Sequence, residues 1–357
     1  METHVVIMAG GVGSRLWPIS VPQTPKQFID VLGVGKTLIQ LTVERFLPVC
    51  PLDHFWVVTG ERYVEKVREQ LPGIPVDQIL AEPEPRNTAP CIAYACWKIG
   101  VKHPDANVVV TPADALVLEK EHFARVISDA LAFTAESDAI VTVGIAPTRP
   151  DTGYGYICSS DTVRDKVVKV LEFKEKPTLE VAKEYLAAGN YFWNAGIFVW
   201  KLSTITRELR AHAPQICGVM DELAPSFYTP GEAAALRKLF PTCEKISIDY
   251  AVMEKSSRIF VIAGDLGWSD LGGWSSVKEH IEADAGGNAL VAASETSASE
   301  TDIRLFDVKN TIVHASDAKT VVVQGLDGYI VAAKDGNILI CRLADEQHIK
   351  EYSAPKQ

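Results

Sequence analysis

The chain has 357 residues, 47% of them apolar, which is enough for one large hydrophobic core plus a smaller unit. Its formal net charge of −11 argues against nucleic acid as a partner, because binding a phosphate backbone needs a basic face. Seven scattered cysteines without a Cys-x-x-Cys pair argue against a zinc site or a disulfide framework, and without a signal peptide or a long apolar run we expect a cytoplasmic protein with no membrane contact.

The first predicted element is a buried strand over residues 5–8, followed at once by a glycine-rich loop over residues 9–18. Arg15 and, slightly later, Lys26 bring positive charge to this loop. The loop differs from the dinucleotide fingerprint, which needs a small residue where Leu16 stands, and it lacks the Gly-Lys-Ser/Thr end of a P-loop. It predicts a polyphosphate cradle, with an ordinary strand-to-helix turn as the alternative. The glycines that would present backbone N–H groups to phosphate are Gly10, Gly11 and Gly13.

Short apolar runs separated by helically spaced segments predict an alternating β/α pattern. Continuous apolar strands joined by helices imply a mostly parallel sheet that is covered on both faces, with ligands bound beyond the carboxyl ends of its strands. Helices are expected after Thr37, which forms a capping pattern with Gln40, and from Thr88 to Gly100. The expected strands are residues 5–8, 55–59, 78–81, 108–111 and 139–143.

The segment Glu-Pro-Glu-Pro-Arg-Asn-Thr-Ala-Pro, residues 82–90, occupies a turn between an expected strand and an expected helix. Glu82 can accept hydrogen bonds from a purine, Asn87 can both donate and accept, and the helix end supplies unpaired N–H groups. The segment therefore predicts a site for a polar aromatic ligand. The alternative is a proline-stiffened connector in which Thr88 is the N-cap.

Two aspartates far apart in the sequence are candidate metal ligands. Asp114 follows the strand over residues 108–111, at the same sheet edge as the glycine-rich loop, and Asp270 lies in Trp-Ser-Asp-Leu-Gly-Gly-Trp. Mg²⁺ prefers one or two carboxylates together with phosphate oxygens and water, so the pair could hold one Mg²⁺. Taken singly, each aspartate is more often a cap or a turn residue.

The middle of the chain supplies a second group of candidates. Gly153 lies among tyrosines, where a hydroxylated ligand could approach the backbone, although an ordinary hairpin has the same pattern. Glu175 and Lys176 follow a strand and suit a sugar hydroxyl and a phosphate, or form a charged turn. Asn194 interrupts an aromatic run and must be bonded if buried, either by a ligand hydroxyl or by the backbone.

The composition predicts two domains, residues 1–285 and 286–357. In the first, residues 151–200 are expected to form a substrate lid, and helices are expected over 203–240 and 248–255. In the second, short β-rich runs alternate with Asp-Gly turns, which predicts a small all-β unit of hairpins or solenoid coils and a candidate homodimer contact.

Taken together, these segments resemble those of bacterial mannose-1-phosphate guanylyltransferases, also called GDP-mannose pyrophosphorylases, in the sugar-phosphate nucleotidyltransferase superfamily. The resemblance runs from residue 5 to the C-terminus. Its strongest parts are GGVGSRLWP with PKQF, EPEPRNTAP, PAD at 112–114, PTRPDTGYGYI, FKEKP, FWNAGIF, SIDYAVMEK at 247–255 and WSDLGGW.

The resemblance implies an α/β fold, a Rossmann-like, GT-A-like mixed sheet flanked by helices, plus a small C-terminal domain like a short left-handed β-helix. It implies that the oxygen of mannose 1-phosphate attacks the α-phosphorus of GTP in line, releasing pyrophosphate and forming GDP-mannose, with Mg²⁺ as cofactor. No covalent enzyme intermediate is needed, because the substrate supplies its own nucleophile. The fused isomerase domain of longer family members is not expected here.

The same resemblance implies a role for each candidate residue. Arg15 and Lys26 would be catalytic, Asp114 and Asp270 would bind the metal, and two further sets would bind the substrates. The nucleotide set is Gly10, Gly11, Gly13, Ser14, Glu82, Asn87 and Thr88. The sugar-phosphate set is Gly153, Glu175, Lys176 and Asn194.

Three positions depart from the family pattern, namely Val21, Ala115 and Ala195, where the family often has Arg, His and Ser. None of them carries phosphate or metal chemistry in this interpretation, so they bear on sugar and base preference. Two alternatives therefore stay open. One is guanylyl transfer to another hexose or heptose 1-phosphate, and the other is a catalytically silent GDP-sugar-binding regulatory subunit.

Overall fold

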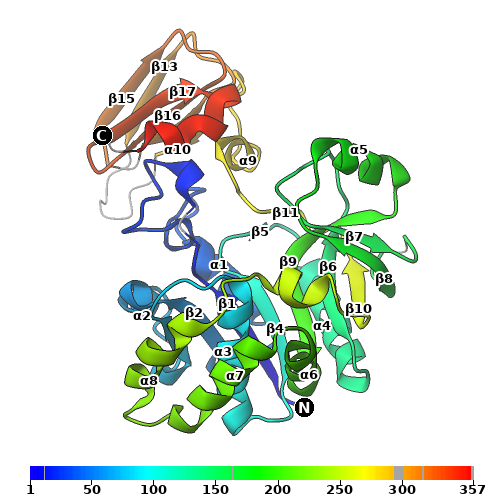
Figure 1. Ribbon diagram of the computed structural model, residues 1–357. Coiled ribbons are helices and arrows are strands. Elements are labelled where there is room, and N and C mark those ends of the chain that lie inside the picture. Colours follow the sequence, from blue (N-terminus) through cyan, green and yellow to red (C-terminus); the bar gives the residue numbers. More distant parts are fainter. Residues whose placement is uncertain (12, 163, 293–300, 316, 355–357) are drawn as a thin grey trace. The chain divides into compact units, whose positions relative to one another are not determined.

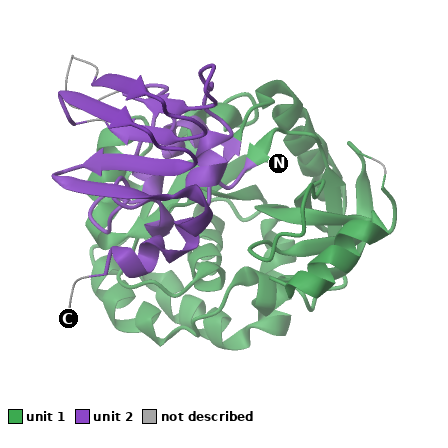
Figure 2. Ribbon diagram, turned by 90° about the horizontal axis from the view of Figure 1, so that it is seen from above, with its two compact units in different colours: residues 1–10, 43–113, 117–268 green, residues 11–42, 114–116, 269–357 purple. Residues whose placement is uncertain are grey.

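The computed structural model describes residues 1–354 with the exception of 12, 163, 293–300 and 316. The chain forms two compact units, each built from several segments of the sequence (Figure 2). The first unit comprises residues 1–10, 43–113 and 117–268, and the second comprises residues 11–42, 114–116 and 269–357.

The first unit is built on one nine-stranded sheet (Figure 1). Its strand order is β3-β2-β1-β4-β9-β6-β10-β8-β7. The strands are β1 (Thr3–Met8), β2 (Phe55–Gly60), β3 (Ile79–Glu82), β4 (Asn107–Pro112), β6 (Ile140–Ile145), β7 (Tyr156–Ser159), β8 (Val167–Lys174), β9 (Tyr191–Lys201) and β10 (Ile259–Ala263).

This sheet is mixed, as the family resemblance implied, and the expectation of a mostly parallel sheet from the apolar runs was wrong. Strands β3, β2, β1 and β4 are parallel, but β9 runs antiparallel to both β4 and β6. Strand β8 is likewise antiparallel to β10, and β7 is antiparallel to β8 and β9. An apolar run is compatible with either direction, because its direction depends on which neighbours it pairs with.

Helices cover both faces of the sheet. Val6 and Val108 pack with α3, α6 and α7, while their neighbours Val5 and Val109, which point to the other face, are also fully buried. Residues on both sides of β1 and β4 are therefore shielded, as the continuous apolar runs predicted. None of the helices in the described part of the chain is long and apolar enough to cross a bilayer. The helices of this unit are α2 (Val64–Gln70), α3 (Thr88–Lys102), α4 (Lys120–Glu136), α5 (Leu179–Ala188), α6 (Leu202–His212), α7 (Pro214–Leu223) and α8 (Glu232–Leu239).

Local sequence signals explain several helix ends. Helix α5 begins after Thr178, whose hydroxyl accepts from the N–H of Val181, and it ends at Gly189, whose φ is +75°. Helix α3 continues past Gly100 to Lys102, because a glycine interrupts a helix only when its backbone turns left-handed. The helix expected over 248–255 is a short π-helical turn, Asp249–Met253.

The second unit combines the glycine-rich loop region with the C-terminal strands. Strands β12, β14 and β16 pair in parallel, β17 joins them antiparallel, and β13 pairs in parallel with β15. Parallel pairing of alternate strands is the pattern of a short coil, which agrees with the expected solenoid. The strands are β12 (Ala289–Val291), β13 (Asp302–Phe306), β14 (Ile312–Ala315), β15 (Thr320–Gln324), β16 (Tyr329–Lys334) and β17 (Asn337–Arg342).

The chain passes between the two units five times, in the loops after Gly10 and Ala113 and within three short elements, α1 (Leu38–Phe46), β5 (Leu116–Val117) and β11 (Trp268–Ser269). The division into units thus differs from the predicted boundary between 285 and 286. The physical reason is a shared hydrophobic core, in which Leu16 and Ile29 pack in one cluster with Ile312 and Ile330. Leu16 and Ile29, which follow the glycines in the sequence, therefore hold this loop within the second unit.

Candidate functional site

The glycine-rich loop and the segment that carries Asp114 leave the sheet at the same edge. Strands β1 and β4 are parallel neighbours, and Met8 at the end of β1 pairs with Pro112 at the end of β4. The expectation that Asp114 follows its strand at the same sheet edge as the glycine-rich loop is therefore confirmed.

Within the second unit, Lys26 joins the two candidate metal ligands. The residue is only 4% exposed, and its Nζ lies 3.0 Å from Oδ2 of Asp114. The same ammonium donates a hydrogen bond to the backbone carbonyl of Asp270. Three residues separated by up to 244 positions in the sequence thus meet at one buried positive charge.

The loop of residues 269–273 also contacts Arg15. Nη1 of Arg15 lies 3.4 Å from the carbonyl oxygen of Gly272, whose own N–H donates to Oδ1 of Asp270 at 3.0 Å. Leu271 between them is fully buried and has a φ of +46°, in the left-handed region. Arg15 and Lys26 therefore approach the same short loop, and both would face negative charge bound there.

The three glycines of the cradle have different structural roles. Gly13 has a φ of +65°, and a Cβ at this position would lie 2.6 Å from Cβ of Lys26. Gly13 is therefore required for the close approach of the loop to Lys26. At Gly10 and Gly11 a Cβ would meet nothing within 4 Å, which leaves their backbone open to a ligand. Ser14 begins the 3₁₀ turn η1 (Ser14–Leu16), and Val12 lies outside the described residues.

We predict that Gly13→Ala lowers the free energy of unfolding by about 2 kcal/mol or more, because it adds both a left-handed backbone strain and an overlap with Lys26. Urea unfolding of the purified protein measures this loss. The matched control is Gly11→Ala, which adds the same methyl group to open space and should change stability by about 0.5 kcal/mol or less. Equal stability of the two variants would contradict the prediction.

The carboxylates of Asp114 and Asp270 suit a hard divalent cation. Both offer oxygen ligands, and the Asp114 side chain is 39% exposed, so water or phosphate oxygens can complete the coordination. The backbone N–H groups of the glycine-rich loop and the side chains of Arg15 and Lys26 could hold phosphates bound beside such an ion. In their chemistry, these donors fit Mg²⁺.

In the first unit, Glu82 lies at the end of β3 and is 7% exposed. Its Oε1 has no hydrogen-bond partner among the residues that the structure describes. Burial raises the pKa of this carboxyl to about 7. A buried carboxylate oxygen without a donor is costly, so the site favours a ligand that brings N–H groups.

Asn87, and not Thr88, caps helix α3. Asn87 has a φ of +69°, and its Oδ1 accepts from the N–H of Thr88 at 2.8 Å. The hydroxyl of Thr88 instead accepts from the N–H of Ile248 at 2.9 Å. The expectation that Thr88 is the cap was therefore wrong, because Asn87 precedes the helix and its side chain accepts the first free N–H.

The structure brings most of the sugar-phosphate candidates together around Gly155. The carbonyl of Gly155 accepts from the N–H of Asn194 at 2.8 Å, and a Cβ at Gly155 would lie 2.5 Å from Oε2 of Glu175. Lys176 is exposed and lies 3.2 Å from Glu175. Gly153, two residues earlier, donates its N–H to Asp151 at 2.8 Å.

Asn194 is bonded by protein groups, and one of them was missed by the sequence analysis. Its Oδ1 accepts from the hydroxyl of Thr142 at 3.1 Å and from the N–H of Gly196 at 3.0 Å. Its Nδ2 donates to Asp249 at 3.1 Å. Burial and the charge of Glu175 raise the pKa of Asp249 to about 7. The signal available was a single acidic residue within the otherwise apolar segment 248–253.

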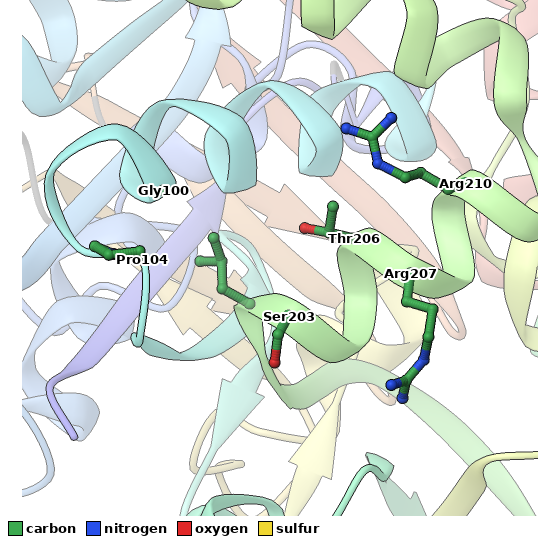
Figure 3. Close-up of a pocket in the computed structure, with 7 residues that line it drawn as sticks. Gly100, Pro104, Ser203, Thr206, Arg207 and Arg210 are labelled. Atoms are coloured by element: carbon green, nitrogen blue, oxygen red, sulfur yellow. The ribbon is translucent and has the colours of Figure 1, made fainter.

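A separate surface pocket lies beside the C-terminal end of α3. Gly100, Pro104, Ser203, Thr206, Arg207 and Arg210 line it (Figure 3). Its two arginines are paired with carboxylates, one with Asp138 at 3.2 Å and the other with Asp221 at 2.7 Å. The pocket contains none of the predicted site residues.

Comparisons with known proteins find related sequences and a related fold. A family model described as nucleotidyl transferase matches residues 4–286. A Vibrio cholerae protein provisionally named mannose-1-phosphate guanylyltransferase is 39% identical over 97% of this chain and 72% of its own length. The mannose-1-phosphate guanylyltransferase of Salmonella muenchen is 35% identical over 92% of this chain and 70% of its own. The crystal structure of mannose-1-phosphate geranyltransferase from Thermus thermophilus superposes with a TM-score of 0.87, at 30% identity, over 99% of this chain and 98% of that one.

Proposed function

Since the chain belongs to the nucleotidyl transferase family, we propose that it transfers a guanylyl group from GTP to mannose 1-phosphate, giving GDP-mannose and pyrophosphate. Relatives at 35% and 39% identity carry the name of this activity. The observation that carries the proposal is the meeting of Lys26 with Asp114 and Asp270 beside the glycine-rich loop. A cytoplasmic location and Mg²⁺ as the cation are parts of the same proposal.

The reaction needs alignment and charge stabilisation more than acid–base chemistry. An oxygen of the sugar phosphate attacks the α-phosphorus in line and pyrophosphate leaves, so a P–O bond forms as another breaks. Backbone N–H groups of the loop, Arg15 and Lys26 would stabilise the negative charge on the phosphoryl oxygens and the leaving group. Bound to Asp114 and Asp270, Mg²⁺ would neutralise part of the phosphate charge.

The environment of Glu82 supports guanine as the base. Guanine presents two adjacent donors, N1–H and the 2-amino group, which a carboxylate can accept together, whereas adenine presents no such pair. The unpartnered Oε1 of Glu82 is an acceptor of the required kind. Asn87 and Thr88, at the start of α3, would contact the base or the ribose.

We predict that Glu82→Gln raises the KM for GTP roughly 10- to 100-fold, because one charge-assisted hydrogen bond is lost and the new amide repels a guanine donor. In the unsubstituted protein, the KM for GTP should fall as the pH rises through about 7, since only the ionised carboxylate accepts both donors. Steady-state kinetics between pH 6 and 8.5 measure both effects.

The control is Glu84→Gln, which removes a carboxylate two residues away that pairs with Arg86. It should leave the KM for GTP and its pH dependence unchanged. Glu82 is not the base ligand if the Glu82→Gln variant retains the pH dependence of the unsubstituted protein.

Around Gly155, Glu175 and Asn194 would hold the sugar, Gly153 would line it and Lys176 would reach its phosphate. One experiment tests the whole proposal, namely a matrix of nucleoside triphosphates and sugar 1-phosphates in which pyrophosphate release and the sugar nucleotide are both measured. GTP with mannose 1-phosphate should give the highest kcat/KM. A higher value with another hexose or heptose 1-phosphate would support that transferase instead. GDP-mannose binding without any release of pyrophosphate would support a silent regulatory subunit.

A further inference from the structure

The segment of residues 343–352 packs on the loop that carries Asp270, within the second unit. It forms the 3₁₀ turn η9 (Leu343–His348) and the helix α10 (Ile349–Tyr352). A carboxylate oxygen of Glu346 accepts a hydrogen bond from the backbone N–H of Ser275 at 2.9 Å. Ser275 lies in the first turn of α9 (Trp274–Lys278), where N–H groups lack acceptors within the helix.

Glu346 also lies against the residue that ends this loop. A Cβ at Gly273 would come within 2.7 Å of Oε2 of Glu346. Glycine at this position therefore leaves the space that the carboxylate occupies. The N–H of Gly273 donates to the hydroxyl of Ser276 at 3.2 Å, so the junction between the loop and α9 is held from two sides.

Two further contacts of this loop belong to the proposed reaction site. The carbonyl of Asp270 accepts from Lys26, and the carbonyl of Gly272 accepts from Arg15 at 3.4 Å. Only a few residues connect these carbonyls to Gly273. A shift of Gly273 would therefore move the two carbonyl groups that accept from Arg15 and Lys26. It would also move the carboxylate of Asp270.

The C-terminal segment contacts the glycine-rich loop as well. Ile349 of α10 is fully buried in the same hydrophobic cluster as Leu16, Leu271 and Trp274. The segment thus packs on residues that follow the cradle glycines and on residues that follow Asp270.

We propose that Glu346 is a positioning residue for the Asp270 loop, and that the turn η9 supports the phosphate and metal site through this side chain. This role rests on the proposed function, because guanylyl transfer is the reaction for which the Asp270 loop must be positioned. Helix α9 has only five residues and is unstable by itself, so its first turn depends on an outside acceptor. Without Glu346 the loop samples other positions, and small misplacements of aligned groups are costly for rate.

The test compares Glu346→Ala, Glu346→Gln and the control Glu351→Ala. Glu351 lies in α10, and its side chain is 74% exposed, so its removal deletes the same charge from the same segment. We expect Glu346→Ala to speed amide hydrogen exchange in residues 269–276 about fivefold, the effect of a lost cap. Exchange in strands β14 and β16 should not change. Glu346→Gln keeps an acceptor oxygen and should restore most of the protection.

The second readout is the dependence of pyrophosphate release on Mg²⁺. Glu346→Ala should raise the Mg²⁺ concentration for half-maximal rate and lower kcat about 10-fold, whereas Glu351→Ala should match the unsubstituted protein. Unchanged exchange in residues 269–276 would overturn the positioning role, and so would faster exchange spread evenly over the second unit. If the unsubstituted protein released no pyrophosphate, the proposed function would fail, and hydrogen exchange would still decide the role of Glu346.

Discussion

Lys26→Ala lowers the turnover of guanylyl transfer by about 10²- to 10³-fold, the largest single effect that we expect in this protein. The ammonium is buried and held in one orientation by the Asp114 carboxylate and the Asp270 carbonyl. A charge fixed in this way stabilises the developing negative charge on the phosphoryl group without any reorganisation of solvent. Single-turnover rates at saturating GTP and mannose 1-phosphate measure the loss.

Two further variants separate catalysis from folding. Lys26→Met keeps most of the buried aliphatic volume, so it should remain folded and show the same loss of turnover. Lys36→Ala removes a positive charge from an exposed position of the same unit and should keep full turnover. Turnover of Lys26→Met within about threefold of the unsubstituted protein would remove Lys26 from the reaction, because a charge partner of this kind contributes roughly 3 kcal/mol.

Asp270→Asn gives the second large effect, a fall in turnover of about 10²-fold together with a higher Mg²⁺ requirement. Replacing a carboxylate by an amide removes one negative charge from the ligand set while the loop keeps its shape. Asp114→Asn should act in the same direction, because it also releases Lys26 from its ion pair. Titration of the initial rate with Mg²⁺, at fixed GTP, measures both variants.

The control is Asp302→Asn, at an exposed position of the second unit where the carboxylate pairs with Arg304. It should match the unsubstituted protein at every Mg²⁺ concentration. A chelator in excess should stop the reaction of the unsubstituted protein. Full activity under those conditions would exclude the metal role of both Asp114 and Asp270.

The local elements of the fold were predictable because their signals lie close together in the chain. The apolar run before the glycine-rich loop is strand β1, and α5 is bounded by two local signals, the cap at Thr178 and the glycine at 189. Hydrophobic periodicity and capping act over a few residues, so they survive in almost any tertiary context. The family resemblance relies on such local motifs too, and the comparisons confirm it.

The direction of β9 and the extent of the second unit were not predictable in this way. The sequence of β9 is an aromatic run that is compatible with parallel and with antiparallel pairing. In the sheet, β9 lies between β4 and β6. Leu16 reads as an apolar residue of a loop, and its packing with Ile312 and Ile330 depends on strands far later in the chain. Such contacts are decided by how whole elements fit together.

For the candidate site, the sequence alone indicated the residue types, the glycine-rich cradle and the resemblance to a family that joins sugar phosphates to nucleotides. Only the tertiary structure decided that Lys26 meets both Asp114 and Asp270, that Asp249 supports Asn194, and that Glu346 lies against Gly273. The physical reason is distance along the chain. Local hydrogen bonding and hydrophobic periodicity depend on residues close together in the sequence. The partners of a buried charge lie far away in the sequence, and they meet it only when the core packs distant segments together.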